Sequence, residues 1–588
     1  MTFLLMGFGV YAQNEAIARQ YFEKGDYEKA IVYYEKLHKK NPNHRNYLLA
    51  LVESYQQTGQ FENAEGVLLK ALENKRVNPI LFIETGYNYQ LMKKKSKAEE
   101  YYNKALNAID DNPNFTYGIG KAFKSKSLLE YAIKAYKKGM KLDPKFNFNY
   151  DLAYIYGEMG DIENMYDMYL DLMLERTNLT NNIKRSLSRF IGSDTDGSNN
   201  LLFKKLLLKR AQANPNILWN ELLSWLFIQQ KEYKNAFAQE KAIYNRSPES
   251  SINSIVDLGG MASEAGDHET AKDIYGFVIE NTADQQLIMF SKLKLITFSL
   301  SNAKKREYKA INTQFEALLE EYGMTAQTVP IQIAYAKFLA FDMDRSEAGI
   351  DMLKEALILP LNRFSKAQIR MNLGDILVYK EQFNQALIFY SQVQKSLKND
   401  VIGQQARFKV AQTSFYKGDF DWAETQLKVL KSSTSQLIAN DALELKLLIS
   451  DNRLQDSTHT ALKIYAKADL LAYQEKNEEA IQLLDTILTK HRYEPIEDEA
   501  LLRQALLYEK EGNYEKAAYN YQKVIEFYPT DILMDDALYH LALLYTDVLE
   551  KPEEAKSLLE RIIFEHEDSV FFVDARKKYR MLRGDAIN

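Results

Sequence analysis

The chain contains 588 residues, of which 46% are hydrophobic and 27% are charged, so it can bury a large core. Its 24 Gly and 11 Pro are few for this length, which excludes collagen-like and low-complexity classes and argues against a fold of many β-hairpins. The formal charge of −6 comes without a basic stripe, so nothing indicates a nucleic-acid partner. Because the chain has no Cys, disulfides, thiolate metal sites and cysteine nucleophiles are excluded.

The start of the chain has the order of a secretory signal. An apolar run covers residues 3–11, and the short side chains of Val10 and Ala12 precede polar residues from Gln13 onward. This order predicts a signal peptide over residues 1–12, cleaved after Ala12, and an exported, periplasmic protein. The run is far shorter than the ~20 apolar residues that a spanning helix needs, so no transmembrane segment is expected. Since no Lys or Arg precedes the run, a buried first helix is the alternative.

A 34-residue period organises the N-terminal part of the chain. Small and large residues recur in phase in four units, whose turns lie at Gly25, Gly59, Lys93 and Ser127. The small residues predict that two antiparallel helices approach each other closely. The large residues are expected to fill the space between neighbouring units. The positions concerned are Ala18, Gly86 and Gly120 in the first helices and Ala30, Tyr34, Ala64, Leu68, Ala98, Tyr102, Ala132 and Tyr136 in the second. The pattern resembles the tetratricopeptide repeat (TPR) family of stacked helix–turn–helix units.

The resemblance implies an all-α, TPR-type superhelical solenoid of antiparallel helix pairs with a C-terminal cap helix. Slips in the phase of the repeat divide the chain into segments. We expect an N-terminal TPR array over 13–175, an irregular helical linker with a polar loop over 176–216, a middle TPR-like array over 217–325, a C-terminal TPR array over 326–568, and a cap helix with tail over 569–588.

The C-terminal array has longer repeats and one irregular interval. Its neighbouring repeats lie 37 or 38 residues apart, whereas Ala423 and Ala480 are 57 residues apart. The surplus predicts one inserted helix at about residues 437–450. This half of the chain also resembles exported TPR proteins of Bacteroidota, on residues 431–442 and 576–585. That resemblance supports export and implies no activity.

The motifs of the chain give no sign of catalysis. None of the seven His lies four residues from another, and neither an H-E-x-x-H nor a Walker A sequence occurs. The polar loop at residues 192–200 lacks the first and twelfth ligands of a calcium loop. We therefore expect no enzyme activity, no cofactor and no metal site.

The residues expected to bind a partner lie on the first helices of the repeats, which line the concave face of a TPR array. In each of three C-terminal repeats, an Asp or Gln is followed four positions later by a Tyr, so that both side chains lie on one helix face. These groove residues are Asp375, Tyr379, Gln412, Tyr416, Asp469 and Tyr473, joined in the N-terminal array by Tyr87, Tyr117 and Lys121. If they line a groove, replacing the three C-terminal tyrosines with Ala abolishes binding and hardly changes the thermal midpoint. The alternative is that these tyrosines pack between repeats.

The sequence therefore predicts a non-catalytic scaffold of the bacterial cell envelope that binds a peptide or protein segment in the concave groove of a TPR solenoid. Peripheral association with the inner face of the outer membrane is compatible with this prediction. The alternative is a cytoplasmic TPR adaptor or regulator. The two differ in whether the mature chain begins at Gln13. No nucleic-acid partner is expected, and the oligomeric state is left open.

Overall fold

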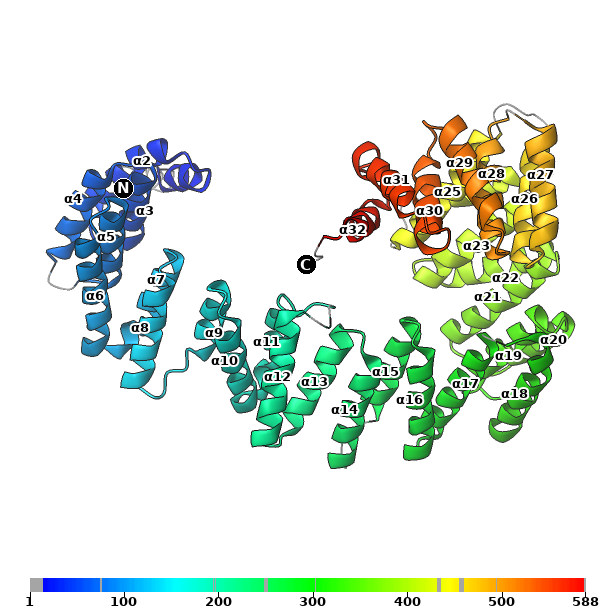
Figure 1. Ribbon diagram of the computed structural model, residues 1–588, viewed down its shortest axis with the longest axis horizontal. Coiled ribbons are helices and arrows are strands. Elements are labelled where there is room, and N and C mark those ends of the chain that lie inside the picture. Colours follow the sequence, from blue (N-terminus) through cyan, green and yellow to red (C-terminus); the bar gives the residue numbers. More distant parts are fainter. Residues whose placement is uncertain are drawn as a thin grey trace, which may run out of the picture. The chain divides into compact units, whose positions relative to one another are not determined.

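A computed structural model describes residues 14–585, except 75–76, 194, 196, 248–251, 302, 431–434, 454–458 and 493. Within these residues all regular secondary structure is helical, and no β-strand occurs. Consecutive helices pack side by side in antiparallel pairs (Figure 1), which confirms the expected all-α solenoid. The expected signal peptide lies outside the described residues.

The chain divides into two compact units, and unit 1 ends at Ile274. Residues 14–23 form its first described helix. The following helices are α2 (Tyr27–Lys40), α3 (Arg45–Gln57), α4 (Phe61–Leu72), α5 (Ile80–Leu91), α6 (Lys95–Asp111), η1 (Pro113–Phe115), α7 (Thr116–Ser125), α8 (Leu129–Leu142), α9 (Asn149–Glu158), α10 (Ile162–Glu175), η2 (Thr177–Leu179), α11 (Thr180–Leu187), α12 (Ser198–Ala213), α13 (Ile217–Gln229), α14 (Tyr233–Arg246), α15 (Asn253–Glu264) and α16 (His268–Asn281).

Unit 2 begins at Tyr275. Its helices are α17 (Gln285–Ser301), η3 (Lys305–Glu307), α18 (Tyr308–Tyr322), α19 (Val329–Phe341), α20 (Ser346–Ala356), α21 (Arg363–Tyr379), α22 (Phe383–Ser396), α23 (Val401–Lys417), α24 (Phe420–Leu430), α25 (Gln436–Asp451), α26 (Thr460–Tyr473), α27 (Asn477–Lys490), α28 (Glu497–Lys510), α29 (Tyr514–Phe527), α30 (Met534–Asp547), α31 (Pro552–Glu565) and α32 (Phe572–Arg583). The last of these, α32, stands where the sequence predicts a cap helix.

The segment expected as an irregular linker contains the helices α11 and α12. Helix α12 contacts both α10 and α13, so helix stacking continues through this segment. Asn200 Nδ2 of α12 donates to the carbonyl oxygen of Gly192, which lies between α11 and α12, over 3.0 Å. Gly192 and Asn200 lie inside unit 1, and the division between the two units falls within α16.

The small residues of the repeat sit where two paired helices touch. A Cβ atom added to Gly120 would lie 2.5 Å from the ring of Tyr136, and one added to Gly374 would lie 2.4 Å from the ring of Tyr390. Both tyrosines are buried. Since even a methyl group does not fit at these two positions, the close approach that the sequence predicts is present.

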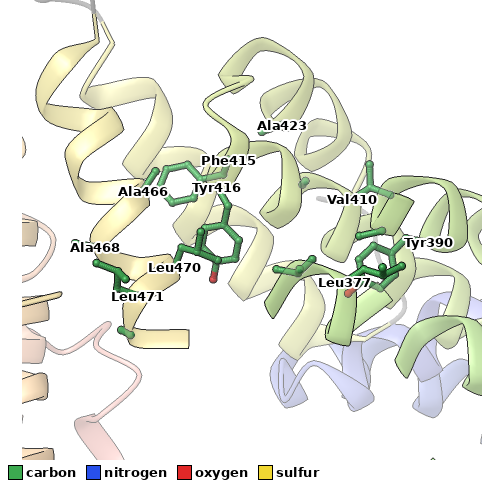
Figure 2. Packing of buried hydrophobic residues seen from close by; sticks show 14 of the residues in the cluster. Leu377, Tyr390, Val410, Phe415, Tyr416, Ala423, Ala466, Ala468, Leu470 and Leu471 are labelled. Carbon is green, nitrogen blue, oxygen red and sulfur yellow. The ribbon is translucent and has the colours of Figure 1, made fainter. Parts of the chain in front are cut away.

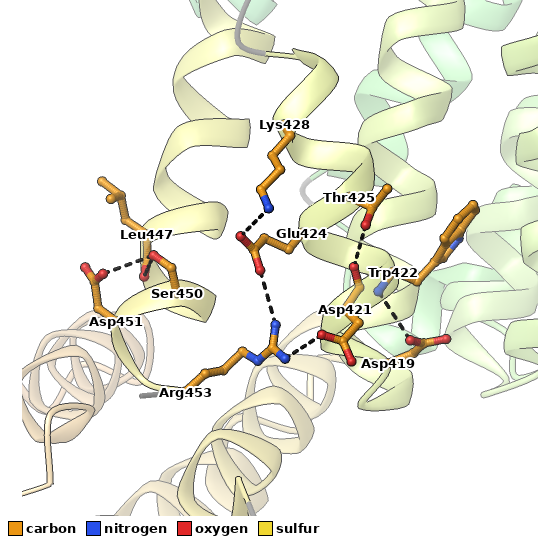
Figure 3. Close-up of polar contacts among 10 residues, drawn as sticks. All are labelled: Asp419, Asp421, Trp422, Glu424, Thr425, Lys428, Leu447, Ser450, Asp451 and Arg453. Atoms are coloured by element: carbon orange, nitrogen blue, oxygen red, sulfur yellow. Dashed lines mark hydrogen bonds and ion pairs between the residues drawn. The ribbon is translucent and has the colours of Figure 1, made fainter. Parts of the chain in front are cut away.

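Helix α25 interrupts the regular pairing of unit 2 at the interval where the sequence predicts an inserted helix. Its buried side chains are Ile438, Ala442 and Ile449, and they belong to the core cluster of unit 2. Arg453, just beyond the helix, forms ion pairs with Asp421 and Glu424 of α24 (Figure 3). These contacts fix the inserted helix against the pair α23–α24.

After the inserted helix, α26 packs against helices much earlier in the chain. The hydroxyl of Tyr473 donates to the carbonyl oxygen of Asp375 over 3.2 Å, across 98 residues of sequence. Gln474 Nε2 donates to the carbonyl oxygen of Tyr379 over 2.8 Å. Figure 2 shows the core that forms here, with residues of α23 and α26 in one cluster. Helices α21, α23 and α26 are therefore held together.

Candidate functional site

Four helices of unit 2 surround a pocket of about 490 Å³. Each helix contributes residues three or four positions apart, which is the spacing of one helix face. The lining residues are Phe408, Gln412 and Tyr416 of α23; Asp441, Glu444, Leu445 and Leu448 of α25; Tyr465, Asp469, Ala472 and Tyr473 of α26; and Glu499, Leu502, Arg503 and Leu506 of α28, with Ile532 and Leu533 before α30. The inserted helix thus closes a side of the pocket that a regular repeat would leave open.

The pocket combines apolar walls with an excess of acidic side chains. Its lining contains four carboxylic acids and a single basic group, Arg503. Arg503 Nη2 lies 2.6 Å from Asp469 Oδ1, so this ion pair neutralises one of the four acids. Neither Asp441 nor Glu444 forms an ion pair with another described residue. The potential inside the pocket is therefore negative.

The surroundings of Glu444 disfavour its charged form. Partial removal of water by the neighbouring helices raises the pKa of Glu444, and the negative charges of Asp441 and Asp469 raise it further. On α30, burial together with Asp535 and Glu444 raises the pKa of Asp536 to about 7. In both groups burial is the largest cause of the raised pKa, and neighbouring carboxylates raise it further.

A second pair of acids lies at the start of α28. Asp498 is buried, and burial next to Glu499 raises its pKa far above the ordinary value for Asp. Burial also raises the pKa of Glu499. Asn452 Nδ2 donates to Glu499 Oε1 over 2.8 Å, which fixes the orientation of that carboxyl group. Two adjacent buried acids thus disfavour a second negative charge at the start of α28.

Four of the nine predicted groove residues meet at this pocket, namely Gln412, Tyr416, Asp469 and Tyr473. Tyr416 is only 9% exposed and belongs to the core cluster of unit 2. Its ring centroid lies 6.3 Å from that of Tyr473. These two tyrosines therefore pack in the core and also contribute to the pocket wall. Their role in binding stays a prediction.

The other two C-terminal groove residues are not among those that line the pocket. Asp375 accepts a hydrogen bond from the Tyr390 hydroxyl at 2.7 Å, and its Oδ1 lies 3.3 Å from Lys409 Nζ. The ring of Tyr379 meets Phe341 edge to face at 5.1 Å. Both residues thus contact neighbouring helices of unit 2.

The N-terminal groove residues lie in unit 1. Lys121 lines a cavity of about 550 Å³ together with Lys124, Ser125, Ser127, Leu129 and Glu158. Tyr117 is 53% exposed, with Lys121 Nζ 6.0 Å from its ring centroid. Lys126 Nζ lies 5.0 Å from the ring centroid of Tyr87. Each of these tyrosines therefore already has a lysine over its ring, at distances typical of a cation–π contact.

The sequence did not indicate five charged or polar residues of the unit 2 pocket, which are Asp441, Glu444, Tyr465, Glu499 and Arg503. The available signal was the spacing of Asp441, Glu444 and two leucines along the inserted helix, which matches one helix face. That signal could not be assigned to the groove, because the inserted helix has no counterpart in the repeat that would define its inward face.

Two kinds of feature are absent from the residues that the structure describes. Within the described ranges, no three or more His, Asp or Glu side chains are grouped so that they could hold a metal ion. Of the helices in the described part of the chain, none is both long and apolar enough to cross a membrane.

Comparisons with known proteins find the repeat in three places. Residues 21–81, 465–532 and 536–569 each match a tetratricopeptide repeat family. No curated protein matches the sequence. A structure of Naa15/Naa10 bound to HypK-THB is 14% identical with a TM-score of 0.28, over 98% of this chain and 96% of that chain. The crystal structure of the APC/C hetero-tetramer Cut9-Hcn1 is 12% identical with a TM-score of 0.21, over 97% and 96%.

The likeness to these two structures is too low to support an argument about function. The family matches are more informative, because one lies in unit 1 and two lie in unit 2. In each unit they coincide with helices that pack as adjacent pairs. The chain therefore carries tetratricopeptide repeats in both of its compact units.

Proposed function

We propose that the protein is a non-catalytic scaffold of the bacterial cell envelope, which binds a peptide or protein segment in the pocket of unit 2. The observation that carries this proposal is the pocket itself, enclosed by one face of each of four helices. Stacked helical repeats characteristically use concave surfaces to bind other proteins. The repeats thus supply a rigid frame, and the inserted helix α25 supplies a wall.

The lining of the pocket suits a segment of polypeptide. Tyr416, Tyr465 and Tyr473 offer large rigid surfaces, and aromatic side chains of this kind dominate many protein interfaces. Gln412 can both donate and accept hydrogen bonds, as a peptide backbone requires. Ile532 is 62% exposed and adds an apolar contact at the pocket. Such a mixture matches a guest with alternating apolar and polar groups.

Site-specific photocrosslinking in the source cells tests this proposal. Benzoylphenylalanine replaces Ile532, which lines the pocket, and in a matched control it replaces Ile388 on α22, which is 56% exposed but does not line the pocket. We expect a discrete crosslinked protein from position 532 that is absent from position 388. Identical products from both positions, or none from position 532, would contradict a partner site in this pocket.

The cell envelope is the part of the proposal that rests on sequence. The apolar run over residues 3–11, followed by Ala12 and a polar stretch, supports export, as does the resemblance of the C-terminal half to exported TPR proteins of Bacteroidota. N-terminal sequencing of protein purified from its own cells should find Gln13 first. Finding Met1 or Thr2 would favour the alternative, a cytoplasmic TPR adaptor.

A further inference from the structure

We propose that the pocket of unit 2 receives a guanidinium group, the end of an arginine side chain in a segment of the partner protein. This inference rests on the proposed function, because it names what the same pocket recognises. Its support comes from the charge of the pocket, from the nature of its walls, and from the hydroxyl group of a largely buried tyrosine in the lining, which has no hydrogen-bond partner among the described residues.

The charge of the pocket calls for a cationic guest. After the ion pair between Asp469 and Arg503, the lining still contains Asp441, Glu444 and Glu499, with no further basic side chain. Lys409 is not part of the lining; it pairs with Asp375, and its Nζ lies 5.9 Å from the ring centroid of Tyr473. A guest that carries one positive charge would therefore reduce the repulsion among these acids.

The walls of the pocket favour an organic cation with an aliphatic stem. Leu445, Leu448, Leu502 and Leu506 provide apolar surface between the carboxylates, and Phe408 adds an aromatic ring. Long basic side chains bury their methylene groups against such surfaces while the charged end meets polar groups. The rings of Tyr416 on α23 and Tyr465 on α26 also line the pocket and offer aromatic surface on which a planar cation can stack.

Tyr465 provides evidence for a guest that is independent of the charge of the pocket. It lines the pocket although it is only 8% exposed, and its hydroxyl forms no hydrogen bond with any described residue. The charges that act on this hydroxyl are those of Asp469, Arg503, Glu499 and Glu444, which all line the same pocket. The Tyr465 ring is buried while its hydroxyl oxygen opens onto the pocket, so this oxygen is free to accept a hydrogen bond from a guest. An N–H donor of the guest would satisfy this oxygen.

A guanidinium group fits these features better than an ammonium group does. It is planar, it presents five N–H donors in a fixed fork, and it stacks on aromatic rings. The acceptors here come from different helices, with Glu444 on α25, Tyr465 on α26 and Glu499 on α28. A forked donor can reach several such acceptors at once, whereas an ammonium group is a compact and strongly hydrated point charge.

The test measures binding of small probes to the full-length chain by saturation-transfer NMR. The probe is Nα-acetyl-arginine methylamide, and the comparison probes are the citrulline and lysine analogues. Citrulline keeps the shape of arginine and lacks its charge. We expect saturation of the arginine side-chain methylene protons, with at least tenfold weaker binding of the other two probes, as a charge-dependent and geometry-dependent site requires. Equal binding of citrulline or lysine, or no binding of arginine, would overturn the inference.

Variants locate the binding within the molecule. Asp441→Asn combined with Glu444→Gln removes two exposed carboxylates of the pocket and should weaken arginine binding about tenfold. The matched control is Glu478→Gln combined with Glu479→Gln, which removes two exposed carboxylates from α27 and changes the net charge equally. Binding by the control should stay within about twofold of the original, because screened charges outside the site contribute little. Equal weakening in both double variants would mean non-specific attraction.

Tyr465→Phe provides a second variant that changes no charge. It removes only the hydroxyl, and we expect weaker arginine binding with an unchanged circular dichroism spectrum. Unchanged binding would remove Tyr465 from the site.

The photocrosslinking experiment separates this inference from the scaffold itself. If benzoylphenylalanine at position 532 crosslinks a partner equally well in the Asp441→Asn/Glu444→Gln background, the scaffold stands and the guanidinium assignment is wrong. If position 532 gives no specific product in any background, the scaffold proposal fails.

Discussion

Tyr416 illustrates how a single residue can serve both the core and the surface of a repeat protein. It lies at a groove position of the repeat, and it also lines the pocket of unit 2. Yet it is 9% exposed, and Figure 2 shows its ring beside Leu470 in the core cluster. At this residue the burial of the ring favours the alternative, in which the tyrosine packs between repeats and its replacement lowers stability.

Replacement of Tyr416 by Ala should lower the free energy of unfolding of unit 2 by about 3 kcal/mol, since removal of a buried aromatic ring leaves a cavity. The matched control, Tyr117→Ala, removes a ring that is 53% exposed and should change stability by at most about 0.5 kcal/mol. Urea denaturation followed by circular dichroism measures both. Equal small effects would show that Tyr416 belongs to an open groove rather than to the core.

Asp536 should make the protein less stable as the pH rises. Its pKa is about 7 in the folded chain, against an ordinary value of 3.8. Between these values the folded state holds more protons than the unfolded state, so the stability contributed by the protonated group is lost as pH increases from about 4 to about 7. Asp536→Asn removes the titrating group. As the pH rises from 5 to 7.5, the denaturation midpoint of this variant should therefore increase relative to that of the original protein.

The control for this comparison is Asp568→Asn, which neutralises an exposed carboxylate. Its denaturation midpoint should run parallel to that of the original protein across the same pH range. If the Asp536→Asn profile is parallel as well, the folded chain does not hold a proton on Asp536 at neutral pH.

Lys93 is strained by the turn between α5 and α6. Its φ of 61° lies in the left-handed region, where Gly59 has a φ of 75° one repeat earlier. Lys93→Gly should raise the unfolding free energy by about 0.5 kcal/mol, because Gly adopts this conformation without the clash of a Cβ atom. Glu99→Gly, at an exposed position inside α6, should instead lower it by about 1 kcal/mol. A lower thermal midpoint for Lys93→Gly would contradict this account.

Among the elements, the inserted helix shows what a repeat pattern can and cannot predict. The 57-residue interval predicted a helix at about 437–450, and α25 spans Gln436–Asp451. The position and length of this helix could be predicted because the flanking repeats define how many residues lie between them. The face of the helix that lines the pocket could not be predicted, so Asp441 and Glu444 were missed. The return of α26 onto α21 was also unpredictable, since it depends on hydrogen bonds across 95 or more residues.

Ala517 tests whether damage stays local within an array of stacked pairs. It is fully buried in α29, where Ala517→Leu should overpack the contact with α28 and destabilise it by ~1–3 kcal/mol. Because each repeat mainly contacts its neighbours, amide hydrogen exchange should increase over residues 480–565 and stay unchanged before residue 175. Glu515→Leu, at an exposed position of the same helix, is the control. A uniform increase along the chain would contradict a solenoid with local coupling.

For the whole molecule, periodicity predicted the fold class and left the division into units unpredicted. The repeat phase was clear over residues 25–144, because Gly, Ala and Tyr recur there at one spacing. The two compact units divide within α16, and the segment boundaries drawn from slips in the repeat phase stay predictions. The phase of a repeat shows where helices begin and end. The division into compact units depends on contacts between helices, which a single sequence does not show.

The central claim is that a partner segment binds in the pocket of unit 2, and amide hydrogen exchange of the full chain tests it most directly. Exchange is compared for the chain alone and with the purified partner that position 532 captures. The account predicts slower exchange in the pocket helices α23, α25, α26 and α28, with no change in α22 and α27, which do not line the pocket. Protection of other helices, with the four pocket helices unchanged, would contradict it.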